Sequence, residues 1–207
     1  MNLEKENKLI EKQFSDIAKT IIQNKSNNSF YHKLTFNTNQ LIDHKNYTDY
    51  PNSKGDLVDQ FKPLNIIKEN HCLYWFELNS NEETIKINEL LNNYRLKKDQ
   101  LGNKTVPAKN TYKSSSKEEI RNVLYLGVRQ GGYVKSKKLT NIVGRLNQHL
   151  GYYKVKSTQG LQLYEYAKGK DFDITIKVIE FEGLNPKYLN IIENEVAKVF
   201  KPLSGRH

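Results

Sequence analysis

The first 70 residues combine one helical pattern with a long aperiodic stretch. Residues 3–24 place apolar side chains at helical spacing, with Lys and Glu between them, which predicts one amphipathic helix that docks through its apolar face. From residue 25 to residue 70 the chain is rich in Asn, Ser, Thr, Asp and Lys, and no hydrophobic period holds for long. We therefore expect irregular structure there.

Strand and helix patterns alternate through the rest of the chain. Apolar runs of strand length are separated by segments whose apolar positions recur at helical spacing. The last of these helical segments ends at Pro202. This order predicts an α+β fold with strands at 71–79, 122–129 and 172–181 and helices at about 81–101, 139–150 and 187–200.

Positive charge is concentrated in one part of the 207-residue chain. The sequence has 33 Lys and Arg against 23 Asp and Glu, and residues 111–170 alone carry twelve basic and three acidic side chains. Such a block attracts polyanions, so we expect a nucleic-acid partner, although many of these lysines could be ordinary solvated surface. The charge alone does not distinguish DNA from RNA. The basic side chains that we expect to contact nucleic acid are Arg129, Lys135, Lys137, Lys138, Lys154 and Lys156.

Several classes of protein do not fit the composition. No stretch approaches the ~18–20 apolar residues of a membrane span, and residues 1–12 are polar where an export signal would be apolar. Cys72 is the single cysteine, so the chain forms no internal disulfide, which fits a reducing, cytoplasmic compartment. The segment 127–132 lacks the Lys-Ser/Thr pair of a phosphate-binding loop, which argues against nucleotide hydrolysis.

Three polar residues within apolar helical patterns suggest chemistry on phosphate. Arg145 and His149 are four positions apart and therefore project from the same helical face. A guanidinium there could hold two phosphate oxygens. Glu193 lies between apolar residues of the last helix, and an inward-facing carboxylate needs a partner such as a divalent cation.

Four motifs, in order, resemble the GIY-YIG nuclease family. CLYWFEL at 72–78 is similar to the first motif, with Cys72 where the family has Gly, and LYLG at 124–127 is similar to the second. GRLNQHL at 144–150 resembles the helix in which an Arg is followed four residues later by His or Tyr. ENEVAKVFKP at 193–202 has the family's nine-residue interval between a metal-binding Glu and a Pro. Each motif is weak alone, and together they are specific.

The resemblance implies a metal-dependent endonuclease that hydrolyses phosphodiester bonds in DNA. It implies a small, mainly antiparallel three-stranded sheet over 71–207, flanked by helices, with residues 1–70 as an N-terminal extension. Glu193 would hold one Mg²⁺ or Mn²⁺, Arg145 would bind the phosphate, Tyr74 or Tyr125 would deprotonate the attacking water, and His149 would move a proton or orient a tyrosine. Fifty residues separate Tyr74 from Tyr125, where most of the family has about ten, which implies an insertion at about 80–120.

Other interpretations of the same residues remain open. Tyr74 and Tyr125 would ordinarily be core aromatics, and Arg145 and His149 would ordinarily be surface charges. Glu195, two positions after Glu193, is expected to be solvent-exposed. The chain could also bind nucleic acid without cleaving it, or be a nuclease subunit that docks a protein partner or a second copy through residues 1–70. The biological role and the target sequence do not follow from the sequence.

Overall fold

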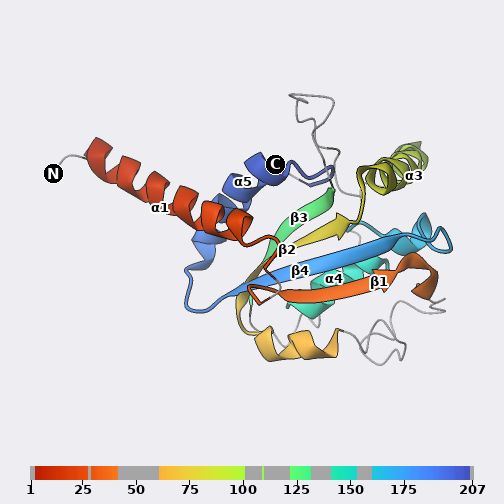
Figure 1. Cartoon of the computed structure of the whole chain (residues 1–207), viewed down its shortest axis with the longest axis horizontal. Helices are drawn as coiled ribbons and strands as arrows, with labels where there is room; N and C mark the ends of the chain where they lie inside the picture. Colours follow the sequence, from red (N-terminus) through yellow and green to blue (C-terminus); the bar gives the residue numbers. More distant parts are fainter. Residues whose placement is uncertain are drawn as a thin grey trace.

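The computed structural model describes residues 3–27, 29–41, 61–100, 109, 122–131, 141–152 and 160–205. Within these ranges the chain forms a four-stranded sheet with helices on both faces (Figure 1). The expected α+β class is confirmed. The helices are α1 (Leu3–Gln23), α3 (Asn81–Gln100), α4 (Ile142–Leu150) and α5 (Leu189–Phe200), and the strands are β1 (His32–Asn37), β2 (His71–Leu78), β3 (Val123–Arg129) and β4 (Asp173–Phe181). Short 3-10 helices are η1 (Thr38–Gln40), η2 (Lys62–Ile67), η3 (Leu163–Glu165) and η4 (Pro186–Tyr188).

The sheet is antiparallel throughout its described strands, in the order β1-β4-β2-β3. β2 is central and pairs with both β3 and β4. In the β2–β3 register Tyr74 lies opposite Gly127, and Phe76 lies opposite Tyr125. Residues two apart on a strand point to the same face, so both tyrosines are on one face of the sheet.

The prediction of a three-stranded sheet is wrong by one strand. Residues 32–37, which the sequence predicted to be irregular, form β1 and pair along their length with β4. β1 is an edge strand in which only Phe36 is buried, so its hydrophobic signal is too weak to stand out among polar neighbours. The sheet therefore includes residues from before position 70, and the division into an extension and a nuclease domain stays a prediction.

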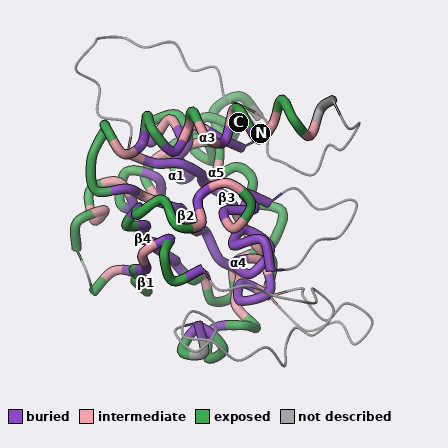
Figure 2. The backbone as a smooth tube through the Cα atoms, turned by 90° about the vertical axis from the view of Figure 1, so that its right-hand side faces the viewer, coloured by how far each residue is buried: buried purple, intermediate pink, exposed green. Residues whose placement is uncertain are grey.

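Two apolar cores lie on opposite faces of the sheet. Alternate residues of β2 supply them, because Tyr74 and Phe76 belong to one core and Leu73 and Trp75 to the other. The first core includes side chains from α3, α4 and η2, and the second includes side chains from α1 and α5. Figure 2 shows the buried positions along the strands and most of α4.

Helix α1 packs on the sheet only through its second half. Phe14 is buried, and its ring lies 5.2 Å from the ring of Tyr188 just before α5. Ile10, one turn earlier on the same stripe, is 49% exposed, and Figure 1 shows α1 extending beyond the sheet. No helix in the described ranges has both the length and the apolar character needed to cross a membrane.

A cluster of charged groups fixes the end of α1 to the sheet. The Glu77 carboxylate lies 3.4 Å from the ammonium group of Lys25 and 3.1 Å from that of Lys177. It also accepts hydrogen bonds from the Trp75 indole at 3.0 Å and from the Asn122 amide at 2.8 Å. Burial raises the pKa of Glu77, but the two lysines and the Trp75 indole lower it more, so the net shift is downward. The carboxylate therefore stays charged at neutral pH.

Candidate active site

The floor of the site consists of two tyrosines that converge over a glycine. The rings of Tyr74 on β2 and Tyr125 on β3 stack with centroids 6.0 Å apart. A Cβ added to Gly127 would lie 2.8 Å from the Tyr74 hydroxyl oxygen, 2.7 Å from Cε1 of Tyr125 and 3.0 Å from its hydroxyl oxygen. Glycine is therefore required at position 127 by this close approach.

Helix α4 brings Arg145 over both tyrosines. The helix begins after Asn141, whose side chain accepts a hydrogen bond from the Gly144 N–H at 3.0 Å. Arg145 then donates from Nε to the Tyr74 oxygen at 3.0 Å and from Nη2 to the Tyr125 oxygen at 3.1 Å. Its Nη1 donates to Gln148 at 3.0 Å. The guanidinium has five N–H groups, and these three hydrogen bonds use one N–H of each nitrogen. Nη1 and Nη2 each keep a second N–H for which the described residues show no acceptor.

The ring of His149 is held in one tautomer. The backbone N–H of Leu161 donates to Nδ1 at 3.1 Å, so Nδ1 carries no proton in the neutral ring. The proton is then on Nε2, which lies 3.0 Å from the Tyr74 oxygen and donates to it. His149 is completely buried, and burial lowers its pKa well below its usual value, with the Arg145 charge lowering it further. The geometry therefore favours orientation of Tyr74 over proton exchange with solvent.

Tyr74 accepts two N–H hydrogen bonds but keeps its own proton. Burial raises the pKa of Tyr74 well above its usual value, and the opposing effect of the Arg145 charge is smaller. For Arg145 itself, burial lowers the pKa, but the two tyrosine oxygens raise it more, so the guanidinium remains charged. The charge of Arg145 favours the phenolate form of Tyr74, but the burial of Tyr74 outweighs this effect.

Glu193 lies near this cluster, on α5. The charge of Arg145 acts on its carboxylate, the charged carboxylate raises the pKa of Tyr74 further, and the side chain is half-buried. Burial raises the pKa of Glu193 to about 7, and the Arg145 charge only partly opposes this shift. The charged form of the carboxylate is therefore disfavoured on balance, and a further positive charge beside it would stabilise that form.

One metal ion would fit the donors that the site offers. The described residues contain no group of three or more His, Cys, Asp or Glu side chains that could enclose a metal. Mg²⁺ is often bound by one or two carboxylates, with water and substrate phosphates completing the shell. Glu193, a carboxylate that an added cation would stabilise, fits that open kind of site.

Of the expected nucleic-acid contacts, Arg129 is at the site. It ends β3 on the same face as Gly127, opposite Cys72. Burial lowers the pKa of Arg129, and the charge of Arg145 lowers it further. Two guanidinium groups that repel each other in this way favour an anion between them. The other expected contacts, Lys135, Lys137, Lys138, Lys154 and Lys156, lie outside the described residues.

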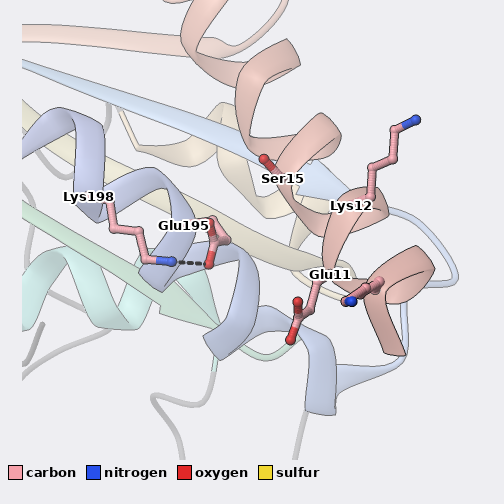
Figure 3. Close-up of a pocket in the computed structure, with 6 residues that line it drawn as sticks. Glu11, Lys12, Ser15, Glu195 and Lys198 are labelled. Carbon is pink, nitrogen blue, oxygen red and sulfur yellow. Dashed lines mark hydrogen bonds and ion pairs between the residues drawn. The ribbon is translucent and has the colours of Figure 1, made fainter. Parts of the chain in front are cut away.

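A groove between α1 and α5 lies apart from this cluster. It is lined by Lys8, Glu11, Lys12, Ser15, Glu195 and Lys198, as Figure 3 shows. Glu195 accepts a hydrogen bond from Lys198 and is half-buried, less exposed than the sequence suggested. Its carboxylate meets the ammonium group of Lys198 at this groove (Figure 3). The two glutamates two positions apart therefore face different surroundings.

Two contacts at the site were missed from the sequence. Gln148 is buried and accepts from Arg145, and its position three residues after Arg145 on the same helix could have indicated this. The Leu161 N–H that fixes His149 is a backbone group, and no side-chain pattern could have identified it.

Comparisons of the chain with protein families, with curated proteins and with solved structures found no match.

Proposed function

We propose that the chain is a divalent-metal-dependent endonuclease of the GIY-YIG type that hydrolyses phosphodiester bonds of DNA. The observation that carries the proposal is the convergence of residues from four separate motifs. Tyr74, Tyr125, Arg145 and His149 form one hydrogen-bonded cluster, and Glu193 interacts with it electrostatically. A surface salt bridge or an ordinary core tyrosine would not account for this arrangement.

Arg145 and Arg129 would bind the scissile phosphate. The transition state of phosphodiester hydrolysis gathers negative charge on the phosphoryl oxygens, and fixed guanidinium donors stabilise that charge. Arg145 is fixed by its two bonds to the tyrosine oxygens, so little reorganisation is needed when a phosphate meets its remaining N–H groups. Arg129 adds a second positive charge to the same face.

Glu193 would hold Mg²⁺ or Mn²⁺. When bound, such an ion supplies Lewis acidity at the phosphate and lowers the pKa of a water molecule. Of the two tyrosines, Tyr74 has no exposed surface and keeps its proton, whereas Tyr125 retains 8% exposure. We therefore assign the contact with the attacking water to Tyr125 and the alignment of Arg145 to Tyr74.

The test is cleavage of supercoiled plasmid by the full chain, with Mg²⁺, with Mn²⁺ and with a chelator. We expect metal-dependent nicking by the wild-type protein and none by Glu193→Gln, which should still bind DNA in a mobility-shift assay because the basic surface is intact. Glu195→Gln is the matched control, since Glu195 faces the α1–α5 groove, and it should cleave normally. Linear DNA, single-stranded DNA and RNA in parallel reactions identify the preferred substrate.

Two results would contradict the proposal. Cleavage that persists in the presence of the chelator would show that the reaction does not need a metal. Full activity of Glu193→Gln would show that Glu193 is not the metal ligand. Binding without cleavage under every condition would favour the alternative, a nucleic-acid-binding protein. Docking of a partner or a second copy through residues 1–70 is measured by the solution mass of the full chain, because deletion of these residues would also remove β1 from the sheet.

A further inference from the structure

Gln162 has a backbone conformation that is rare for its residue type. Its φ and ψ are 55° and 45°, in the left-handed region that favours glycine. The side chain is buried, with 3% exposure. A non-glycine residue stays in this region only where its surroundings hold it there, and such positions gather near functional sites. Gln162 directly follows Leu161, whose N–H fixes the tautomer of His149.

A hydroxyl from the predicted insertion anchors the Gln162 side chain. Tyr94, on α3, donates its hydroxyl proton to Oε1 of Gln162 at 2.6 Å, and both residues are buried. The ring of Tyr94 also lies 5.6 Å from that of Tyr166, just beyond η3. Helix α3 thus contacts the segment that follows α4, where Gln162 is 68 residues away from Tyr94 in sequence.

The segment packs closely against α4 at Gly160. A Cβ added to Gly160 would lie 2.7 Å from the carbonyl oxygen of Gln148, so the backbone of Gly160 rests directly on the C-terminal turn of α4. On the other side of Leu161, the carbonyl oxygen of Gln162 accepts the first hydrogen bond of η3, from the Glu165 N–H at 2.9 Å. Leu161 therefore lies between two fixed neighbours, and its N–H stays within hydrogen-bond distance of His149.

We propose that Tyr94 and Gln162 are positioning residues that set the proton of His149. The hydroxyl of Tyr94 holds Gln162 in the left-handed conformation, and Gln162, fixed in this way, keeps the preceding Leu161 where its N–H meets Nδ1 of His149. The ring proton is then kept on Nε2, where it is donated to Tyr74. The importance of this relay for cleavage rests on the proposed function, but the proton position does not.

Removal of the anchor has a defined consequence at Tyr74. If the Leu161 N–H turns away, Nδ1 can be protonated and Nε2 becomes an acceptor. The Tyr74 hydroxyl would then donate to His149, and its oxygen would keep only the Arg145 donor. The hydrogen-bond pattern at the oxygen that positions Arg145 would therefore change, so turnover should fall while substrate affinity changes little.

The experiment compares two substitutions at one position. Glycine adopts the left-handed region without strain, whereas alanine does not and also lacks the amide that Tyr94 holds. We expect Gln162→Gly to keep the wild-type ¹⁵N shifts of both His149 ring nitrogens in a long-range ¹H–¹⁵N spectrum. Gln162→Ala and Tyr94→Phe should move the Nδ1 shift, and Tyr94→Phe should lower kcat by about 10-fold with KM nearly unchanged.

Tyr166→Phe is the matched control for Tyr94→Phe. It removes a buried hydroxyl from the neighbouring ring, and that hydroxyl has no hydrogen-bond partner among the described residues. Its spectrum should be that of the wild type. The proposal is overturned if Tyr94→Phe leaves the His149 shifts unchanged, or if Gln162→Gly moves them as far as Gln162→Ala does. A wild-type protein that cleaves no substrate would refute the proposed function. The His149 shifts would still decide whether Tyr94 and Gln162 set the position of the ring proton.

Discussion

Replacement of Tyr74 by Phe removes one buried oxygen that two donors share. The Tyr74 oxygen accepts from Nε of Arg145 and, given the tautomer of His149, from its Nε2–H, both at 3.0 Å. Phenylalanine keeps the ring and its packing in the first core but leaves both N–H groups without this acceptor. The change therefore isolates the hydrogen bonds from the hydrophobic contribution of the ring.

The two donors bear different costs in free energy. A buried donor left without an acceptor costs about 1–3 kcal/mol. His149 is completely buried and cannot turn to water, so it bears this cost in full. Arg145 is half-buried and still donates to Tyr125 and Gln148, so its share lies near the lower limit. We expect Tyr74→Phe to lower the free energy of unfolding by about 2–4 kcal/mol, a large part of the ~5–15 kcal/mol typical of a domain.

Urea denaturation followed by the fluorescence of Trp75, the only tryptophan, measures this difference. Tyr125→Phe is the matched control, because the Tyr125 oxygen accepts one described bond, from Arg145, at a position with 8% exposure where water can replace it. We expect it to cost less than about 1 kcal/mol. Equal stability of the two variants would refute the reasoning, because it would mean that His149 does not depend on the Tyr74 oxygen.

Three further variants test other parts of the chain. Gly127→Ala places a methyl carbon 2.7–3.0 Å from atoms of both site tyrosines, so it should abolish plasmid cleavage and lower the melting temperature. Glu77→Ala should lower the free energy of unfolding in urea by about 3 kcal/mol at neutral pH, since two lysines are left without their carboxylate. The pKa of Glu77 is lowered in the folded state, so this difference should shrink as pH falls below the usual carboxyl range. Replacement of Lys135, Lys137 and Lys138 by Ala should reduce the slope of log affinity against log salt by about 0.7–0.9 for each phosphate that the variant no longer binds, and an unchanged slope would show that these lysines are ordinary surface.

The elements nearest the site were the most predictable from the sequence. In α4 the apolar positions Ile142, Val143, Leu146 and Leu150 follow the helical period, and all four are buried. Once that helix is assigned, the spacing of Arg145 and His149 places both on one face. Both side chains then meet the same tyrosine oxygen, because α4 packs on the sheet face that carries Tyr74.

Other features carry too little signal in the sequence to be predicted. β1 is held by its pairing with β4, and pairing is a property of two distant segments rather than of either one. The left-handed backbone at Gln162 is likewise invisible, because nothing in the residue type favours that conformation. In both cases tertiary contacts decide the local structure, and local patterns do not contain them.

The free-energy cost of the long connection between β2 and β3 is smaller than the stabilisation that α3, within that connection, provides. The entropy of closing a loop grows only with the logarithm of its length, so a connection of fifty residues costs about 1.4 kcal/mol more than one of about ten. Ile87 and Leu91 of α3 are fully buried in the core that contains Tyr74, and each contributes about 1.5–3 kcal/mol. Their burial exceeds the closure cost, and β2 and β3 keep one register from the pair Cys72–Arg129 to the pair Phe76–Tyr125.

Helix α3 also supports the outer edge of β3. Arg95 donates to the Ser204 hydroxyl at 2.6 Å, and the Ser204 N–H donates to the carbonyl oxygen of Leu124 at 3.0 Å. The chain after α5 is therefore held along β3, next to Tyr125. Helix α3 therefore contacts residues that support both site tyrosines. Tyr94 contacts Gln162, next to the residue that bonds His149, and Arg95 contacts Ser204, which lies beside Tyr125. Helix α3, which lies between the two tyrosine strands in sequence, is thus part of the framework that positions them, and its removal would disturb both tyrosines.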